Sequence, residues 1–272
     1  MSLLQSFSNL QLRIATGVLG AAVFAGMLFI GAEGCFLLFS LLVFFCQWEF
    51  LSIAPFPFTG MQKAIYSFLG YLGFALLYMA EVFEAPALPL ILILPFILVA
   101  TSIFSADEKP FEKNAWVLFG WIYLSLPWYC LFKMLAGNPY NPLLVLGIFG
   151  LLWMADSGAY FAGRFLGRTK LMPSVSPKKT WEGLAGGLFA SLLLAWLLAG
   201  YLPEFSQTQW LILATTTTLA GTLGDLAESR LKRSLDLKDS GSILPGHGGF
   251  LDRFDGFFLA SPVNYLIAAC FF

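Results

Sequence analysis

Residues 85–104 read APALPLILILPFILVATSIF, twenty residues without a charged side chain. A helix needs about 20 predominantly apolar residues to cross the hydrocarbon core of a bilayer, so this stretch predicts a membrane span. The whole chain of 272 residues is similar in character, with 58% hydrophobic and 11% charged residues, whereas soluble domains carry about 25% charged residues. The composition therefore predicts an integral membrane protein. The net charge of −1 argues against a nucleic-acid partner.

Nine stretches of this kind occur, and the predicted fold class is all-α, a polytopic membrane protein with about nine transmembrane helices. They cover about residues 13–32, 34–53, 64–80, 85–104, 115–136, 141–163, 181–201, 209–224 and 254–272. Pro95 and Pro127 fall inside two of them, where we expect kinks and not breaks. The first stretch resembles a signal peptide in having one basic residue before it, but its length favours a retained helix.

The charges between the spans predict the orientation in the membrane. With a cytoplasmic N-terminus, Lys133 is the one basic loop residue that falls outside. The outer loops then hold four glutamates, Glu33, Glu81, Glu84 and Glu204. This asymmetry is the positive-inside pattern, so we expect a cytoplasmic N-terminus and, with nine crossings, an external C-terminus.

More than half of the charges lie in two loops on the same predicted side. Residues 164–182 and 225–255 contain 17 of the 31 formal charges. We expect the chemistry there, and therefore divide the chain into scaffold helices over residues 1–150 and a catalytic region over residues 151–272.

The second of these loops combines acids, bases and glycines. Residues 221–233 read GTLGDLAESRLKR, and if the eighth helix continues, Asp225, Glu228, Ser229 and Lys232 share one face. A solvated helix end with i,i+4 ion pairs is the alternative interpretation. Residues 244–255 read LPGHGGFLDRFD, where the only histidine lies among glycines that can turn backbone amides toward an anion. Carboxylates at a membrane edge are by default a functional hypothesis.

The first loop offers a matching half. Asp156 places a carboxylate inside an apolar span, and Arg164 and Arg168 follow it. Its alternative role is a hydrogen bond between helices. Residues 176–183 read SPKKTWEG and are predicted to start a helix, with Ser176 as N-cap and Pro177 at the first position. Two lysines at such a helix start would favour phosphate binding.

Cysteine and histidine usage narrows the choice of metal. Cys35, Cys46, Cys130 and Cys270 are isolated in apolar runs without CxxC spacing, so we expect neither structural zinc nor disulfides. A metal ion in this chain needs oxygen ligands. Carboxylates beside lysines and arginines are the combination that Mg²⁺-nucleotide chemistry requires.

The motifs together resemble the phosphatidate cytidylyltransferase (CDP-diacylglycerol synthase) family. The similarity lies in the run from Ser229 to Asp255, in Asp156 to Arg164 and in residues 176–183, so it covers residues 156–256. Family members often have Asn and Ser where this chain has Ala155 and Gly256. The resemblance implies transfer of a cytidylyl group from CTP to phosphatidate, giving CDP-diacylglycerol and pyrophosphate, at the cytoplasmic face of a bacterial inner membrane.

The resemblance also implies the site residues. Mg²⁺, with room for a second cation, would be held by Asp225 and Asp252. The catalytic candidates are Asp225, Asp252, Lys232, Arg233, His247 and Asp255. The substrate-binding candidates are Asp156, Arg164, Ser176, Lys178, Lys179, Glu228, Ser229, Lys238, Asp239, Gly248, Gly249 and Arg253.

Two other functions stay open at this point. A related CTP-dependent enzyme could act on a polyprenol or another lipid alcohol, whose hydroxyl would attack the terminal phosphorus of CTP. An ion-coupled transporter would also use buried carboxylates, but it predicts charges at the bilayer midplane and inverted repeats. The oligomeric state is open as well, with a homodimer as one alternative.

Overall fold

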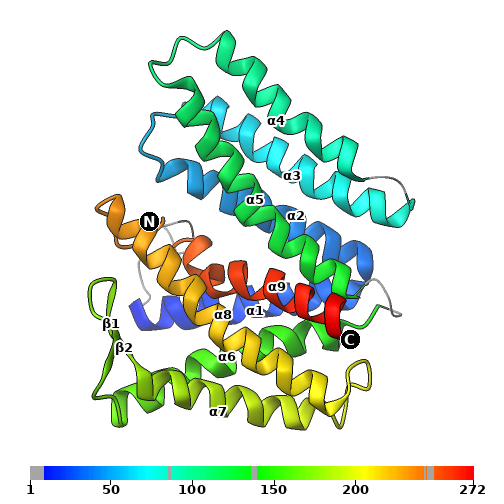
Figure 1. Cartoon of the computed structure of the whole chain (residues 1–272), viewed down its shortest axis with the longest axis vertical. Coiled ribbons are helices and arrows are strands. Elements are labelled where there is room, and N and C mark those ends of the chain that lie inside the picture. The colour runs from blue at the N-terminus through cyan, green and yellow to red at the C-terminus, as the bar shows by residue number, and fades with distance from the viewer. Residues whose placement is uncertain (1–8, 85–86, 136–139, 242, 244–247) are drawn as a thin grey trace. The chain divides into compact units, whose positions relative to one another are not determined.

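The computed structural model describes residues 9–84, 87–135, 140–241, 243 and 248–272 (Figure 1). Helices dominate this part of the chain, with one pair of short strands between α6 and α7. The helices are α1 (Asn9–Ile30), α2 (Ala32–Ser52), α3 (Gly60–Val82), α4 (Ala87–Ile103), α5 (Pro110–Leu135), α6 (Pro142–Phe165), α7 (Trp181–Leu198), α8 (Gln207–Ser234) and α9 (Leu251–Phe271). The strands are β1 (Lys170–Met172) and β2 (Ser176–Thr180).

Each predicted span overlaps one of these helices. As expected, α4 and α5 continue through Pro95 and Pro127. Six helices within the described residues are long and apolar enough to cross a membrane, namely α2, α3, α5, α6, α7 and α9. The protein is therefore a mostly helical membrane protein.

The β1–β2 hairpin corrects one prediction, the helix start at Ser176, and adds two short strands to a fold that is mostly helical as predicted. Ser176 pairs with Met172, and Thr180 pairs with Lys170, in an antiparallel register. The physical reason is that a residue before proline disfavours the helical region, so Ser176 extends into a strand. The N-cap of α7 is Thr180 instead, and its hydroxyl accepts a hydrogen bond from the Gly183 amide at 3.1 Å.

The chain forms two compact units, and each is described by itself. The first unit contains residues 1–129 and 239–253, and the second contains residues 130–238 and 254–272. In the first unit, aromatic side chains fill the core around α2: Phe39 packs on Trp128 and Phe50 packs on Trp116, each with ring centroids 4.7 Å apart.

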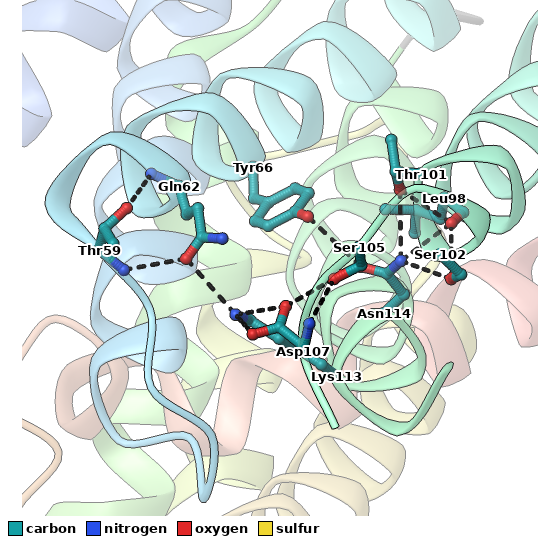
Figure 2. A network of polar contacts seen from close by, with 10 residues as sticks. All are labelled: Thr59, Gln62, Tyr66, Leu98, Thr101, Ser102, Ser105, Asp107, Lys113 and Asn114. Carbon is teal, nitrogen blue, oxygen red and sulfur yellow. Dashed lines mark hydrogen bonds and ion pairs between the residues drawn. The ribbon is translucent and has the colours of Figure 1, made fainter. Parts of the chain in front are cut away.

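A polar network fastens α3 and α5 to the α4–α5 loop in the first unit (Figure 2). The Lys113 side chain is buried and donates hydrogen bonds to both carboxylate oxygens of Asp107, at 3.1 and 3.0 Å. It also contacts Gln62, and its ammonium lies 4.7 Å from the ring centroid of Phe58. The Lys113 ammonium and the Ser105 hydroxyl hold the pKa of the Asp107 carboxyl below its usual value.

In the second unit, α6 and α7 lie side by side (Figure 1). Small residues permit this close approach. A Cβ added at Gly158 would lie 2.6 Å from the Gly186 carbonyl oxygen, and one at Gly187 would lie 2.6 Å from that of Ala155. Because larger side chains would separate the backbones, these small residues determine how near α6 can lie to α7.

The helices α8 and α9 meet in the same unit through glycines and a buried amide. A Cβ at Gly256 would lie 3.1 Å from the Gly221 carbonyl oxygen. Gly256, where family members often have Ser, therefore suits the close contact between α8 and α9. Asn264 of α9 donates to Thr217 at 2.7 Å and accepts from Thr216 at 2.6 Å. These bonds satisfy polar groups that would otherwise be costly inside a membrane.

Candidate active site

The second unit contains a cavity of about 460 Å³ lined by α6, α7, α8 and the hairpin. Its wall is apolar along Leu152, Leu184 and Leu171. Five of the sequence-predicted site residues also line it, namely Asp156, Arg164, Lys178, Lys179 and Asp225. The structure thus brings residues from both charged loops to one hollow.

An ion pair joins the two loops in this wall. The Lys179 ammonium lies 2.5 Å from Oδ2 of Asp225. The hydroxyl of Ser229 donates a hydrogen bond to Oδ1 of the same carboxylate at 3.2 Å, one helical turn further along α8. Because α8 continues to Ser234, the prediction that these residues share one helix face is confirmed.

Further carboxylates lie close to Asp225. Asp156 of α6 interacts electrostatically with both Asp225 and Lys179. Asp255 of α9 interacts electrostatically with Asp225, Glu228 and Asp156. Three helices therefore contribute carboxyl groups to one region around Asp225.

Lys232 and Arg233, which were predicted to act together, lie in different environments. Lys232 is buried and donates to Oε1 of the buried Glu228 at 3.1 Å. Arg233 is exposed and donates to the Leu237 carbonyl at 3.2 Å. Neither lines the cavity, so their predicted action on pyrophosphate stays a prediction.

The root of the hairpin uses residues that the sequence analysis did not assign. The carboxylate of Glu182 accepts hydrogen bonds from the backbone amides of Arg168 and Thr169, each at 3.1 Å. The hydroxyl of Tyr160 accepts a bond from Arg164 at 2.9 Å. Glu182 and Tyr160 lie within the sequence motifs at residues 176–183 and 156–164, and this position could have identified them. Ser176 lies in β2 and does not line the cavity.

The remaining predicted residues belong mainly to the first unit, where we call residues 239–252 the glycine-rich loop. Oδ2 of Asp252 accepts hydrogen bonds from the amides of Ser240 and Gly249, at 3.0 and 3.1 Å. Gly248 has a φ of 83°, a backbone conformation that favours glycine. Exposed side chains are found at Lys238, Asp239 and Arg253. His247 lies outside the described residues.

Comparison with known proteins decides the family. Residues 11–271 match the cytidylyltransferase family. The chain belongs to this family. It is 35% identical to a phosphatidate cytidylyltransferase of Bacillus subtilis (strain 168), over 97% of this chain and 99% of the relative. A phosphatidate cytidylyltransferase of Staphylococcus saprophyticus is 34% identical over 93% of this chain and 97% of its own length. One of Haemophilus influenzae is 46% identical over 46% of each chain.

A cytidylyltransferase site that holds Mg²⁺ needs few protein ligands. Mg²⁺ usually takes one or two carboxylates and completes its coordination with water and phosphate oxygens. Among the residues that the structure describes, no three His, Cys, Asp or Glu side chains form a metal-binding group. The carboxylate of Asp225 in the cavity wall fits the smaller ligand set. The other predicted ligand, Asp252, belongs to the first unit.

Proposed function

We propose that this cytidylyltransferase transfers the cytidylyl group of CTP to phosphatidate, forming CDP-diacylglycerol and pyrophosphate for phospholipid synthesis. The observation that carries the proposal is the cavity in which the Lys179–Asp225 pair meets apolar walls. A charged nucleotide and an acyl-bearing phosphate need such a mixed surface. We place this cavity at the cytoplasmic face of a bacterial inner membrane, since the nucleotide is water-soluble and the charged loops follow the positive-inside pattern.

The reaction is an in-line displacement at the α-phosphorus of CTP. A phosphate oxygen of phosphatidate attacks, a new P–O bond forms, and the bond to the β-phosphate breaks so that pyrophosphate departs. The attacking phosphate is largely ionised at neutral pH, because its second pKa is about 6. The chain's own groups therefore need not supply a strong base.

The cations of the cavity wall bind the phosphates in this mechanism. Lys178, Lys179 and Arg164 line the cavity and can donate hydrogen bonds to triphosphate or phosphatidate oxygens. Lys179 is already paired with a carboxylate, so an arriving phosphate competes with Asp225 for its ammonium. Release of that carboxylate would make its oxygens available to a cation.

We further propose that Asp225 holds Mg²⁺, with Asp252 as the second ligand expected from the family resemblance. Bound Mg²⁺ would neutralise negative charge on the reacting phosphates. Asp225, with Asp156 and Asp255 close to it, would supply the carboxyl oxygens that this ion prefers.

The test uses purified protein, labelled CTP and vesicles that contain phosphatidate, with and without Mg²⁺. We expect CDP-lipid and pyrophosphate in the presence of Mg²⁺. Asp225→Asn should abolish this incorporation while its thermal unfolding and membrane insertion stay unchanged. Asp236→Asn is the matched control, since Asp236 is an exposed acid just beyond the end of α8.

Each outcome has a defined meaning. Full turnover by Asp225→Asn would contradict the metal assignment. Wild-type protein that makes no CDP-lipid would contradict the proposed reaction, and release of CDP without pyrophosphate would indicate phosphorylation of a lipid alcohol instead.

A further inference from the structure

Glu49 is a buried carboxylate in α2 of the first unit, far in sequence from every motif. Its exposed fraction is 2%. A buried charge is costly unless hydrogen bonds compensate it. Oε2 of Glu49 accepts the backbone N–H of Leu251 at 2.8 Å, and the hydroxyl of Ser240 lies beside Oε1 of the same carboxylate, next to Gly249. Both partners belong to the glycine-rich loop, of which the structure describes residues 239–241, 243 and 248–252.

The glycine-rich loop closes tightly around this carboxylate. A Cβ added at Gly241 would collide with Oε1, Cδ and Cγ of Glu49, and one at Gly249 would collide with Oε1 of Glu49 and with the Ser240 hydroxyl. No side-chain carbon fits at such distances. A side chain at either position would therefore have to displace the Glu49 carboxylate.

The same loop also binds the carboxylate of Asp252. The amides of Ser240 and Gly249 donate to Asp252, while Ser240 and Gly249 also contact Glu49. The rings of Phe45, one turn before Glu49 in α2, and Phe250 stack with centroids 5.4 Å apart. Helix α2 thus contacts the loop at five of its residues, Ser240, Gly241, Gly249, Phe250 and Leu251.

We propose that Glu49 is a positioning residue for the cytidylyl transfer: it shapes the glycine-rich loop and thereby sets the orientation of Asp252. The inference rests on the proposed function, in which this loop acts on the substrates. It gives α2 a direct part in the reaction, beyond the scaffold role expected for residues 1–150.

Three substitutions distinguish shape from charge. Glu49→Gln keeps the shape, because its amide oxygen can accept from Leu251 and its amide nitrogen can donate to Ser240. Glu49→Asp keeps the charge but is one methylene too short, and Glu49→Ala removes the group. We expect kcat near the wild-type value for Glu49→Gln and a fall of about 10–100-fold for Glu49→Asp and Glu49→Ala, as for residues that orient metal ligands. The reverse order, with Asp active and Gln inactive, would overturn the proposal.

A double-mutant cycle tests the contact itself. Gly241→Ala should reduce kcat in the wild-type background, because the three atoms nearest to the added methyl group all belong to Glu49. In the Glu49→Ala background the same change should have no further effect. Additive effects of the two substitutions would show that Glu49 does not shape the loop.

A readout without turnover separates this proposal from the proposed function. Lys238 and Arg253 flank the loop and are exposed, so trypsin cleavage at them reports the order of the loop. Cleavage should accelerate in Glu49→Ala and stay at the wild-type rate in Glu49→Gln.

The matched control is Gln47→Leu, which removes another buried polar side chain of α2 that lies against Gly70 and Gly120. This substitution should leave the rate of trypsin cleavage unchanged. Equal acceleration in the control would reduce Glu49 to a general stabilising role and overturn the proposal. If wild-type protein makes no CDP-lipid, the proposed reaction fails, while the cleavage rates still test the contact.

Discussion

At the scale of single residues, buried charges in this protein have identified partners. Lys113 pairs with Asp107, Lys232 with Glu228, and Glu49 with the backbone N–H of Leu251. Removing one partner leaves the other charge buried without compensation. The loss in the free energy of unfolding is then larger than the net contribution of the intact pair. The consequences can be measured one residue at a time.

Asp107→Asn should destabilise the protein at neutral pH by about 1–3 kcal/mol, because the buried Lys113 loses its charged acceptor. The folded-state pKa of Asp107 is lowered, so the pair stabilises the fold above the ordinary Asp pKa of about 4. That stabilisation is lost as the pH falls through the lower folded-state pKa. Thermal unfolding at several pH values should therefore show a difference between wild type and variant that shrinks in acid.

Glu112→Gln is the control for this prediction. Glu112 pairs with Lys109 at 3.1 Å, but both side chains are more than half exposed, and such surface pairs contribute about 0–1 kcal/mol. A loss in the control equal to that of Asp107→Asn, or a difference that grows in acid, would contradict the explanation.

At the scale of elements, the distance between α6 and α7 determines the cavity. Asp156 and Arg164 are carried by α6, whereas Lys178 and Lys179 stand on the strand that leads into α7. The small residues between the two helices therefore allow the charged residues of α6 and of β2 to line the same cavity. A hairpin in place of a longer helix also presents the two lysines on an extended backbone.

Gly187→Val should separate α6 from α7 and lower both stability and activity. Its side chain would collide with the Ala155 carbonyl and the Ala159 methyl group, and overpacking typically costs about 1–3 kcal/mol. Thermal unfolding and CDP-lipid synthesis would measure the two effects. Ala185→Val, at an exposed position of the same helix, should change neither. Wild-type behaviour of Gly187→Val would show that the close packing is dispensable.

At the scale of the whole molecule, the number of crossings depends on three helices. Six helices are long and apolar enough to span, and nine crossings require α1, α4 and α8 as well. The described apolar parts of α1 and α4 are shorter. In α8, Thr215, Thr216 and Thr218 donate to carbonyls of the preceding turn, so the helix can hide its hydroxyls from lipid.

We predict an external C-terminus, which requires an odd number of crossings if the N-terminus is cytoplasmic. A C-terminal alkaline phosphatase fusion should be active, and a C-terminal green fluorescent protein fusion should be dark. The same fluorescent protein at the N-terminus should be bright and serves as the control. The opposite pattern at the C-terminus would mean that one or all of α1, α4 and α8 fail to cross.

The sequence by itself determined the helices and the charged residues of the cavity wall. Apolar stretches of sufficient length can only be helices in a bilayer, because backbone groups must be satisfied within the segment. The spacing of Asp225 and Ser229 likewise predicted their contact on one face of α8. Local periodicity carries such information because both partners belong to the same turn.

Only the tertiary structure decided features whose partners are distant in the chain. The string at Ser176 suits both a helix start and a strand, and pairing with residues 170–172 selected the strand. Glu49 looks like an isolated polar residue in an apolar span, and its partner Leu251 lies 202 residues further along the chain. A buried carboxylate is tolerated only where donors converge on it, and folding alone brings those donors together.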